Sequence, residues 1–157
     1  MNEQQESFMR QAIALSVENV QNGGGPFGAV IVKDGEVLSY GVNRVTANDD
    51  PTAHAEINAI RTAAAKLGTF DLSGCQIYTS CEPCPMCLGA IYWAHLDKIF
   101  YGNTKSDAAK IGFDDSFIYT ELDKPADQRT IETVQLLAKE AIAGFKEWEK
   151  KTDKISY

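Results

Sequence analysis

The sequence lacks any hydrophobic run long enough to cross a membrane. A spanning helix needs about 18 or more consecutive apolar residues, and no stretch of the chain approaches that length. Residues 1–6 are polar and acidic, whereas a secretory signal begins with positive charge and continues with an apolar segment. We therefore expect no membrane span and no signal peptide, and we expect the protein to be cytoplasmic.

Positive charge is also scarce. The chain has 15 basic and 22 acidic side chains, which give a formal net charge of −7. Proteins that bind nucleic acids usually carry a basic surface, because neutralising phosphates supplies much of their affinity. The lysines near the C-terminus suit a solvated helix face; they are Lys146, Lys150, Lys151 and Lys154. The charge therefore favours a small-molecule substrate over a nucleic acid.

Cysteines are few and lie close together. The four are Cys75, Cys81, Cys84 and Cys87. In a reducing compartment, closely spaced cysteines indicate metal binding or catalysis before disulfide bonds. We therefore favour a metal site and keep a disulfide framework as the weaker alternative.

The spacing of apolar residues predicts a single α/β domain. A chain of 157 residues that is 44% apolar suits one domain with a substantial core. The pattern predicts helices over 6–21, about 54–68, 85–94, 107–112 and 130–150, and strands over 27–32, 37–42, 75–80 and 98–101. The first two strands form an antiparallel hairpin, and the strand–helix–strand unit over 75–101 implies a parallel pair. The sequence thus predicts a mixed sheet covered by helices.

Two short motifs predict a catalytic zinc site. They are His54-Ala55-Glu56 and Pro83-Cys84-Pro85-Met86-Cys87, and each lies at the start of a predicted helix. Thiolates and an imidazole select zinc, and three ligands leave the fourth position of the tetrahedron to water. Glu56, which is not a ligand, can then move the protons of that water. We expect one Zn²⁺ per subunit on His54, Cys84 and Cys87.

A closed structural site is the alternative. Cys81 precedes Cys84 by three residues and could complete a four-ligand site, as in a zinc module without enzymatic activity that supports a protein interface. However, Cys81 ends a strand whereas Cys84 follows Pro83, so the two pairs of cysteines differ in geometry. A closed site would also leave Glu56 without a chemical role. Cys75, at the start of its strand, is expected to be a buried hydrophobic residue.

The paired motifs resemble the signature of the cytidine deaminase superfamily, the zinc-dependent nucleobase deaminases. The segment Gly25-Pro26-Phe27-Gly28-Ala29-Val30 is similar to the first strand of that superfamily. The resemblance implies a three-layer α/β/α sandwich with a central mixed five-stranded sheet. It also implies zinc on the three ligands above and Glu56 as the proton shuttle.

Within the superfamily, three segments resemble the bacterial guanine deaminases. They are residues 50–56, 79–93 and 112–119. The first two are shared in outline with tRNA adenosine deaminases, and the third distinguishes the two groups. The resemblance implies hydrolytic deamination of guanine to xanthine and ammonia, as in purine catabolism or salvage. A tRNA adenosine deaminase or another small-nucleobase deaminase is the alternative.

The same resemblance implies roles for five further residues. Asn43 would hydrogen-bond the purine, and Phe27 and Trp93 would line the pocket for its ring. Asp115 would hydrogen-bond guanine and assist proton transfer, and the C-terminal Tyr157 would close the pocket. The resemblance also implies a homodimer of single deaminase domains, each spanning residues 1–157. The C-terminal segment of each domain, about 130–157, could be exchanged between the two subunits.

Each of these residues also has a simpler interpretation. Phe27 and Trp93 could belong to the core, because aromatic residues mostly bury area. Asn43 could cap the turn after its strand. Asp115 and its neighbour Asp114 could be a solvated loop pair, and only the resemblance favours Asp115. A terminal residue such as Tyr157 is disordered by default.

Overall fold

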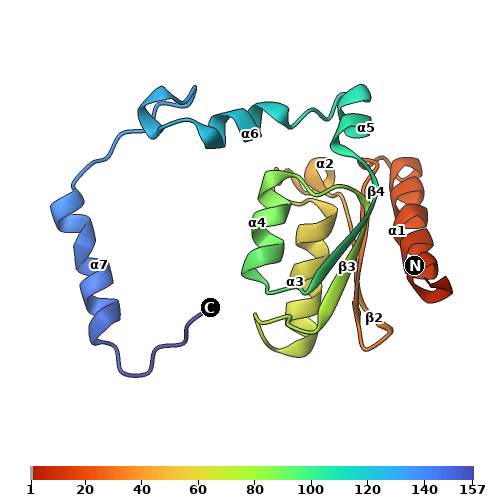
Figure 1. The fold of residues 1–157 in the computed structure, drawn as a ribbon, viewed down its shortest axis with the longest axis horizontal. Coiled ribbons are helices and arrows are strands. Elements are labelled where there is room, and N and C mark those ends of the chain that lie inside the picture. The colour runs from red at the N-terminus through yellow and green to blue at the C-terminus, as the bar shows by residue number, and fades with distance from the viewer. Residues whose placement is uncertain (1) are drawn as a thin grey trace. The chain divides into compact units, whose positions relative to one another are not determined.

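The computed structural model describes residues 2–157, so Met1 of the predicted domain lies outside the described residues. The chain forms two compact units, Met1–Asp115 and Ser116–Tyr157 (Figure 1).

The first unit contains a mixed sheet of four strands. Its elements are α1 (Glu3–Gln21), β1 (Gly28–Lys33), β2 (Glu36–Val42), α2 (Val45–Asn48), α3 (Ala55–Leu67), β3 (Cys75–Cys81), α4 (Pro85–Trp93), β4 (Lys98–Asn103) and α5 (Lys105–Lys110). The strand order is β2-β1-β3-β4. Strand β1 is antiparallel to β2 and β3, and β4 is parallel to β3. The predicted hairpin and the predicted parallel crossover are therefore both confirmed.

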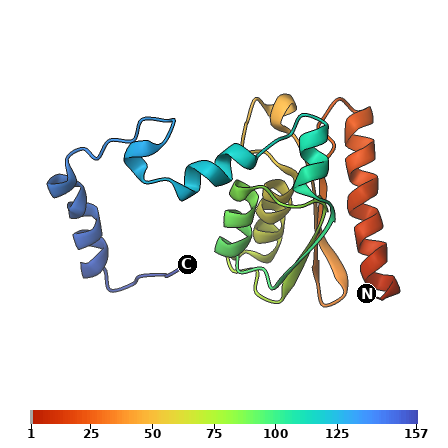
Figure 2. The same cartoon turned by 45° about the horizontal axis from the view of Figure 1, so that its top comes forward.

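Helices cover both faces of this sheet and form three layers. Figure 1 and Figure 2 show α1 on one face and α3 with α4 on the other. Because side chains alternate along a strand, Val30 and Val32 of β1 pack with α1, whereas Ala29 and Ile31 pack with α3 and α4. The central strand is thus buried on both faces, and the predicted α/β/α layering is present.

The five-stranded sheet that the resemblance implied is not confirmed, since residues 2–157 contain four strands. After β4 and α5, the chain continues into α6 (Ser116–Asp123). Ile118 and Leu122 stand four residues apart in this helix, so both side chains lie on one of its faces. The aromatic segment that follows residue 112 therefore contributes no strand.

The second unit is helical, and its last helix is shorter than predicted. It contains α6, η1 (Ala126–Gln128) and α7 (Ala138–Lys150). The prediction of a helix from residue 130 is wrong by eight residues, because α7 begins only at Ala138. The preceding segment contains the β-branched Ile131 and Val134, and Leu137 has a left-handed φ of 53° that interrupts helical geometry.

A close approach between β2 and α3 positions the start of that helix. A Cβ atom on Gly41 would lie 2.0 Å from the carbonyl oxygen of Ala55 and 2.5 Å from the amide nitrogen of Ala59. Only glycine allows the first turn of α3 to press this closely on the strand. The turn that carries His54 and Glu56 is therefore held against the sheet.

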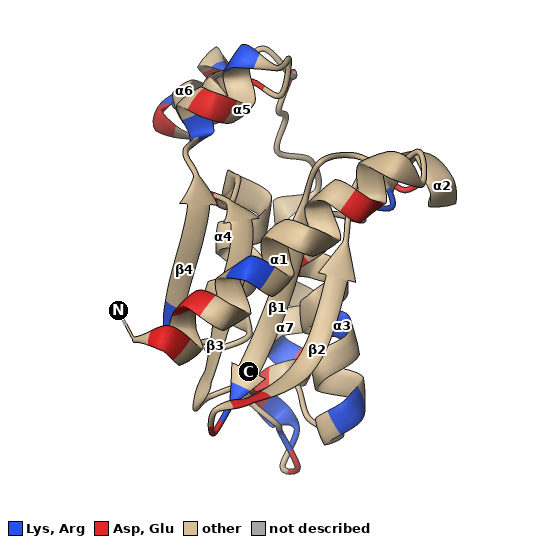
Figure 3. Ribbon diagram, turned by 90° about the vertical axis from the view of Figure 1, so that its right-hand side faces the viewer, with Lys and Arg blue, Asp and Glu red and all other residues tan. Residues whose placement is uncertain are grey.

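The structure also shows the hydropathy of the helices and the distribution of charge along α1. Within residues 2–157, no helix combines the length and the apolar content that crossing a bilayer requires. Figure 3 shows acidic and basic positions interspersed along α1, which carries Glu3, Glu6, Arg10 and Glu18.

Candidate active site

The three predicted zinc ligands lie at the starts of two neighbouring helices. His54 is the N-cap residue of α3 and Cys84 is the N-cap residue of α4, and neither side chain makes a capping hydrogen bond. Pro85 occupies the first turn of α4, where its missing N–H has no helical partner to lose. Helices α3 and α4 lie side by side on one face of the sheet (Figure 1). Their first turns therefore meet at one place.

The ligand atoms have the spacing that zinc requires. The Nδ1 atom of His54 lies 3.5 Å from Sγ of Cys84 and 3.4 Å from Sγ of Cys87. In tetrahedral zinc sites, nitrogen and sulfur ligand atoms are about 3.6 Å apart. Among the described residues, these three form the one group of histidine, cysteine and acidic side chains placed to hold a metal ion. The donor set and its spacing fit Zn²⁺.

The two thiol groups shift each other's ionisation. The pKa of Cys84 is lowered to about 4 by its interactions with the Cys87 side chain and with His54. The pKa of Cys87 is raised by its interaction with the Cys84 side chain and by burial. The pKa of His54 is raised by its hydrogen bond with Cys84. Since zinc binds thiolates and a neutral imidazole, metal binding releases protons from this cluster.

Glu56 lies beside the metal ligands with its carboxyl group buried. Only 6% of the residue is exposed, and burial raises its pKa. The hydroxyl of Thr79 donates to Oε1 over 3.3 Å, and the Cys87 thiol donates to Oε2 over 3.4 Å. A surface charge that merely compensates a helix dipole would be exposed. A buried carboxyl group with a raised pKa can instead both accept and donate a proton.

Cys81 and Cys75 belong to other surroundings. The Cys81 thiol donates to the carbonyl oxygen of Thr104 over 3.7 Å, and burial raises its pKa to about 11. Cys75 is fully buried in the apolar cluster beneath α3 and α4. Among the described residues, neither cysteine joins the metal-binding group. The four-ligand alternative with Cys81 therefore has no support in the geometry.

Asn43 and Phe27 lie on adjoining segments beside the sheet. Asn43 directly follows β2, is 8% exposed, and donates its backbone N–H to the Phe27 carbonyl oxygen over 3.2 Å. Its Oδ1 accepts a hydrogen bond from the backbone N–H of Val45 over 3.3 Å, which is the capping role considered as its simpler interpretation. The ring of Phe27 meets that of Phe113 edge to face, with centroids 5.0 Å apart.

The structure distinguishes Asp115 from Asp114. Asp114 is exposed, whereas Asp115 is partly buried. Burial raises the pKa of Asp115, and the negative charge of Cys84 raises it further. Asp115 therefore lies within electrostatic reach of the zinc ligands.

Trp93 and Tyr157 are placed differently. Trp93 is the last residue of α4 and is 66% exposed. It lies six positions after Cys87, which corresponds to about 9 Å along the helix. Tyr157 belongs to the second unit, where it lines a hollow with Gly144, Phe145 and Trp148. The proposed contacts of Trp93 and Tyr157 with the purine stay predictions.

Three residues near the site were given no role from the sequence. Thr79 holds Glu56, Phe113 packs on Phe27, and Asn19 is a buried amide that donates to the Asn43 carbonyl. Thr79 and Phe113 lie within the segments that carry the resemblance, whereas Asn19 lies in no motif. Only the fold brings these side chains to the site.

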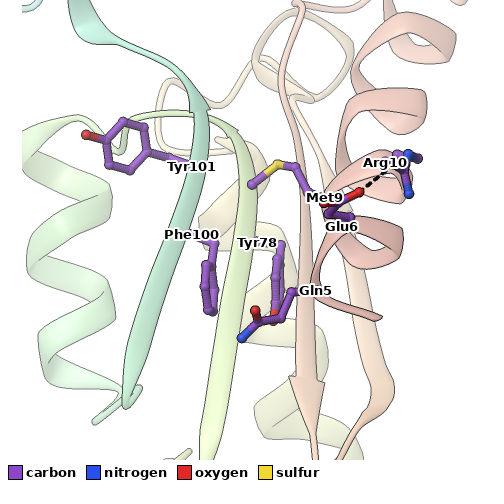
Figure 4. A pocket seen from close by; sticks show the side chains of 7 residues that line it. All are labelled: Gln5, Glu6, Met9, Arg10, Tyr78, Phe100 and Tyr101. Carbon is purple, nitrogen blue, oxygen red and sulfur yellow. Dashed lines mark hydrogen bonds and ion pairs between the residues drawn. The ribbon is translucent and has the colours of Figure 1, made fainter. Parts of the chain in front are cut away.

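A separate hollow lies on the opposite face of the sheet, between α1 and β4 (Figure 4). It measures about 370 Å³ and is lined by Gln5, Glu6, Met9, Arg10, Tyr78, Phe100 and Tyr101. The rings of Tyr78 and Phe100 stack in it with centroids 4.5 Å apart. The hollow contains none of the metal ligands, so we assign no part of the chemistry to it.

Comparison with known proteins agrees with this geometry. Residues 2–103 match the family described as the cytidine and deoxycytidylate deaminase zinc-binding region. The chain belongs to this deaminase family. The matched range contains both motifs, and the deaminase is accordingly a zinc-dependent hydrolase whose His54, Cys84 and Cys87 are placed to hold the metal.

Relatives of the deaminase differ in how much of the chain they match. A guanine deaminase from Bacillus subtilis is 54% identical over 153 residues, which are 97% of this chain and 98% of the relative. An X-ray structure of the Bacillus subtilis guanine deaminase superimposes with a TM-score of 0.95 and 53% identity, and the match covers 100% of this chain and 99% of the other. A tRNA-specific adenosine deaminase from Aquifex aeolicus is 40% identical, and the match covers 61% of this chain and 64% of the relative.

Proposed function

We propose that this deaminase hydrolyses guanine to xanthine and ammonia. The observation that carries the proposal is the extent of the similarity to the guanine deaminase, which runs over 97% of this chain. The family match itself ends at residue 103. The similarity to the guanine deaminase therefore includes segments that zinc binding alone does not require.

Zinc and Glu56 would divide the chemistry. When bound, Zn²⁺ supplies a water molecule whose pKa is lowered to about 7. Glu56 accepts a proton from that water and donates it to N3 of the purine. The same carboxyl group would then take the second proton of that water, from the hydroxyl now bonded to C2, and pass it to the amino group, which leaves as ammonia while a C–O bond replaces the C–N bond. Its buried position beside Thr79 and its raised pKa suit both directions of transfer.

The purine would be held by residues from three segments. Asn43 offers an amide group for hydrogen bonding to the base, and Phe27 with Phe113 offers an edge-to-face aromatic pair against its ring. Asp115, with its raised pKa, would hydrogen-bond guanine and exchange a proton with it. We keep Trp93 as a further contact of the ring, as the resemblance implies.

The net charge weighs against the tRNA alternative. A formal charge of −7 opposes binding to a phosphate backbone. An adenosine deaminase acting on tRNA would also need to accept a flipped base together with its ribose. A free nucleobase makes neither demand, so the observations favour guanine.

A substrate panel tests the proposal directly. Purified zinc-loaded protein would be incubated with guanine, adenine, cytosine and a tRNA anticodon stem-loop, and ammonia release would be followed for each. We expect release from guanine, with xanthine as the second product. Conversion of adenosine in the stem-loop without release from guanine would overturn the proposal in favour of a tRNA deaminase.

We also propose that the protein is a homodimer whose subunits exchange their C-terminal segments, about 130–157. Residues 116–157 include no buried residue, and Ile131, Leu136 and Phe145 are 82%, 78% and 73% exposed. Large exposed apolar groups mark surfaces that another chain covers. In such a dimer, Tyr157 of each subunit would close the pocket of the other.

Mixed dimers test this exchange. One chain would carry Glu56→Gln, and the other would end at Ser156 so that it lacks Tyr157. If Tyr157 acts on the neighbouring subunit, the mixed dimer contains one complete site and recovers activity that neither parent dimer shows. A mixed dimer as inactive as its parents, or a monomer by light scattering, would exclude the exchange.

We propose a cytoplasmic location because the site requires reduced sulfur. All four cysteines are free, and Cys84 and Cys87 bind zinc only as thiolates.

A further inference from the structure

A buried amide at the end of α1 joins the two segments that carry the proposed purine contacts. Asn19 is 6% exposed, although it lies on a helix whose neighbouring positions Val17 and Val20 face solvent. Its Nδ2 donates to the carbonyl oxygen of Gly25 and to that of Asn43, each over 2.8 Å. Both N–H bonds of the amide are therefore used, and each reaches a different segment.

The first of these segments is the glycine-rich turn after α1. The Gly25 carbonyl accepts from Asn19 and also from the backbone N–H of Phe27, over 2.9 Å. The N–H of Gly24 donates to the backbone carbonyl of Asn19 over 2.8 Å. The turn is thus fixed to α1 at both Gly24 and Gly25, and the position of Phe27 follows from it.

The second segment is the end of β2. The backbone of Asn43 donates to Phe27 and accepts from Asn19, so both of its hydrogen-bonding groups have partners. A Cβ atom on Gly25 would lie 3.1 Å from Cγ of Asn43, so the turn also packs directly on that side chain. The backbone on which the Asn43 amide stands is therefore held by Asn19.

We infer that Asn19 is a positioning residue for purine binding, which holds Asn43 and Phe27 in register with each other. The inference rests on the proposed function, because those two residues are purine contacts only there. The zinc ligands start α3 and α4 and accept no bond from Asn19. Loss of the amide should therefore weaken binding of the purine more than it slows the chemical step.

Gly24 supplies a second and independent way to disturb the same contact. A Cβ atom at Gly24 would lie 2.4 Å from Nδ2 of Asn19. Gly24 is not among the glycines with positive φ, so alanine is compatible with its backbone. The added methyl group acts by displacing the Asn19 amide. In Asn19→Ala, the space left by the amide can accept that methyl group.

The experiment measures KM and kcat for guanine in Asn19→Ala, Gly24→Ala and the double variant. We expect each single variant to raise KM about tenfold, as loss of two buried hydrogen bonds suggests, with kcat changed less than about threefold. Zinc content should stay at one per subunit. The double variant should raise KM no further than Asn19→Ala alone, because both changes remove the same contact.

Asn19→Asp separates hydrogen-bond donation from shape. The carboxylate has the same outline but cannot donate to the two carbonyl oxygens, so its KM should rise at least as much as that of Asn19→Ala. Phe8→Leu is the control for general loss of stability, since Phe8 packs on Tyr78 toward the other end of α1. At a comparable fall in Tm, this control should keep the wild-type KM.

The outcomes distinguish this inference from the proposed function. If wild-type protein does not deaminate guanine, the proposed function itself is wrong. If wild-type protein is active, an unchanged KM in Asn19→Ala refutes the inference alone. An equal rise of KM in Phe8→Leu, a multiplicative effect in the double variant, or a wild-type KM in Asn19→Asp would each refute it as well.

Discussion

Replacement of Glu56 by glutamine is the sharpest test of the mechanism. Glutamine has nearly the same shape, and its carbonyl oxygen can still accept the 3.3 Å hydrogen bond from Thr79. The zinc ligands are untouched, so zinc should remain at one per subunit. What is lost is the group that accepts and donates protons beside the metal.

The magnitude follows from the number of proton transfers. A positioned acid or base contributes about 10²–10⁴-fold to a rate. Because Glu56 serves two successive transfers, we expect kcat to fall about 10⁴-fold, which corresponds to about 5.4 kcal/mol of barrier. The KM for guanine should change far less, because the purine contacts lie on other residues.

The stability of the metal-free protein gives an independent check. Burial raises the pKa of Glu56, so the folded state is favoured below the pKa of about 4.5 that the group has when unfolded. That stabilisation is lost as pH rises through the folded-state pKa. Glutamine has no charge to bury, so the metal-free variant should be at least as stable as wild type at pH 7.

The assay combines xanthine formation, zinc analysis and urea unfolding of the chelated protein. Glu56→Asp serves as the matched control, because it keeps a carboxyl group but shortens its reach. A Glu56→Gln variant that retains zinc and turns over guanine within tenfold of the wild-type rate, a factor of about 1.4 kcal/mol, would remove Glu56 from the mechanism.

Three further predictions concern the ligands, the loop after α5 and the packing of the fold. Cys81→Ser should keep one zinc per subunit and nearly all activity, whereas Cys84→Ser should lose the metal. Zinc analysis after dialysis decides between the three-ligand site and the four-ligand alternative with Cys81. Asp115→Asn should lower kcat/KM for guanine by about 10²-fold, as loss of a general acid or base does, while the exposed control Asp114→Asn should stay close to wild type; equal losses in the two would refute the assignment. Gly41→Ala should destabilise the fold by about 1–3 kcal/mol in urea unfolding, because its methyl group would overlap the first turn of α3. An unchanged midpoint for this variant would contradict the close approach.

The zinc ligands were predictable because their geometry is local. A cysteine pair with a spacing of three at the start of a helix faces one way whatever the rest of the fold does. The convergence of His54 with the two cysteines depends on one long-range fact, that α3 and α4 lie on the same face of the sheet, and the structure supplies it. The spacing of apolar residues predicted α3, β3, α4 and β4 because that pattern is also local in the sequence.

The remaining contacts depend on chain segments that meet only in three dimensions. Thr79 reaches Glu56 because β3 runs beneath α3, and Phe113 reaches Phe27 across more than eighty positions of sequence. The helix predicted from residue 130 begins only at Ala138, because Leu137 adopts a left-handed conformation. A leucine in the sequence does not indicate such a conformation. Composition and periodicity do not predict such long-range contacts.

The metal ligands at the starts of α3 and α4 lower the stability of the metal-free fold. An N-cap serine, threonine, aspartate or asparagine would stabilise each helix by about 1 kcal/mol, through a hydrogen bond that neither His54 nor Cys84 makes. The two positions are occupied by metal ligands and not by good caps. The metal-free fold is therefore less stable than its backbone permits, and His54→Ser with Cys84→Ser should raise its melting temperature while abolishing activity. The trade between stability and activity is located at two identifiable residues.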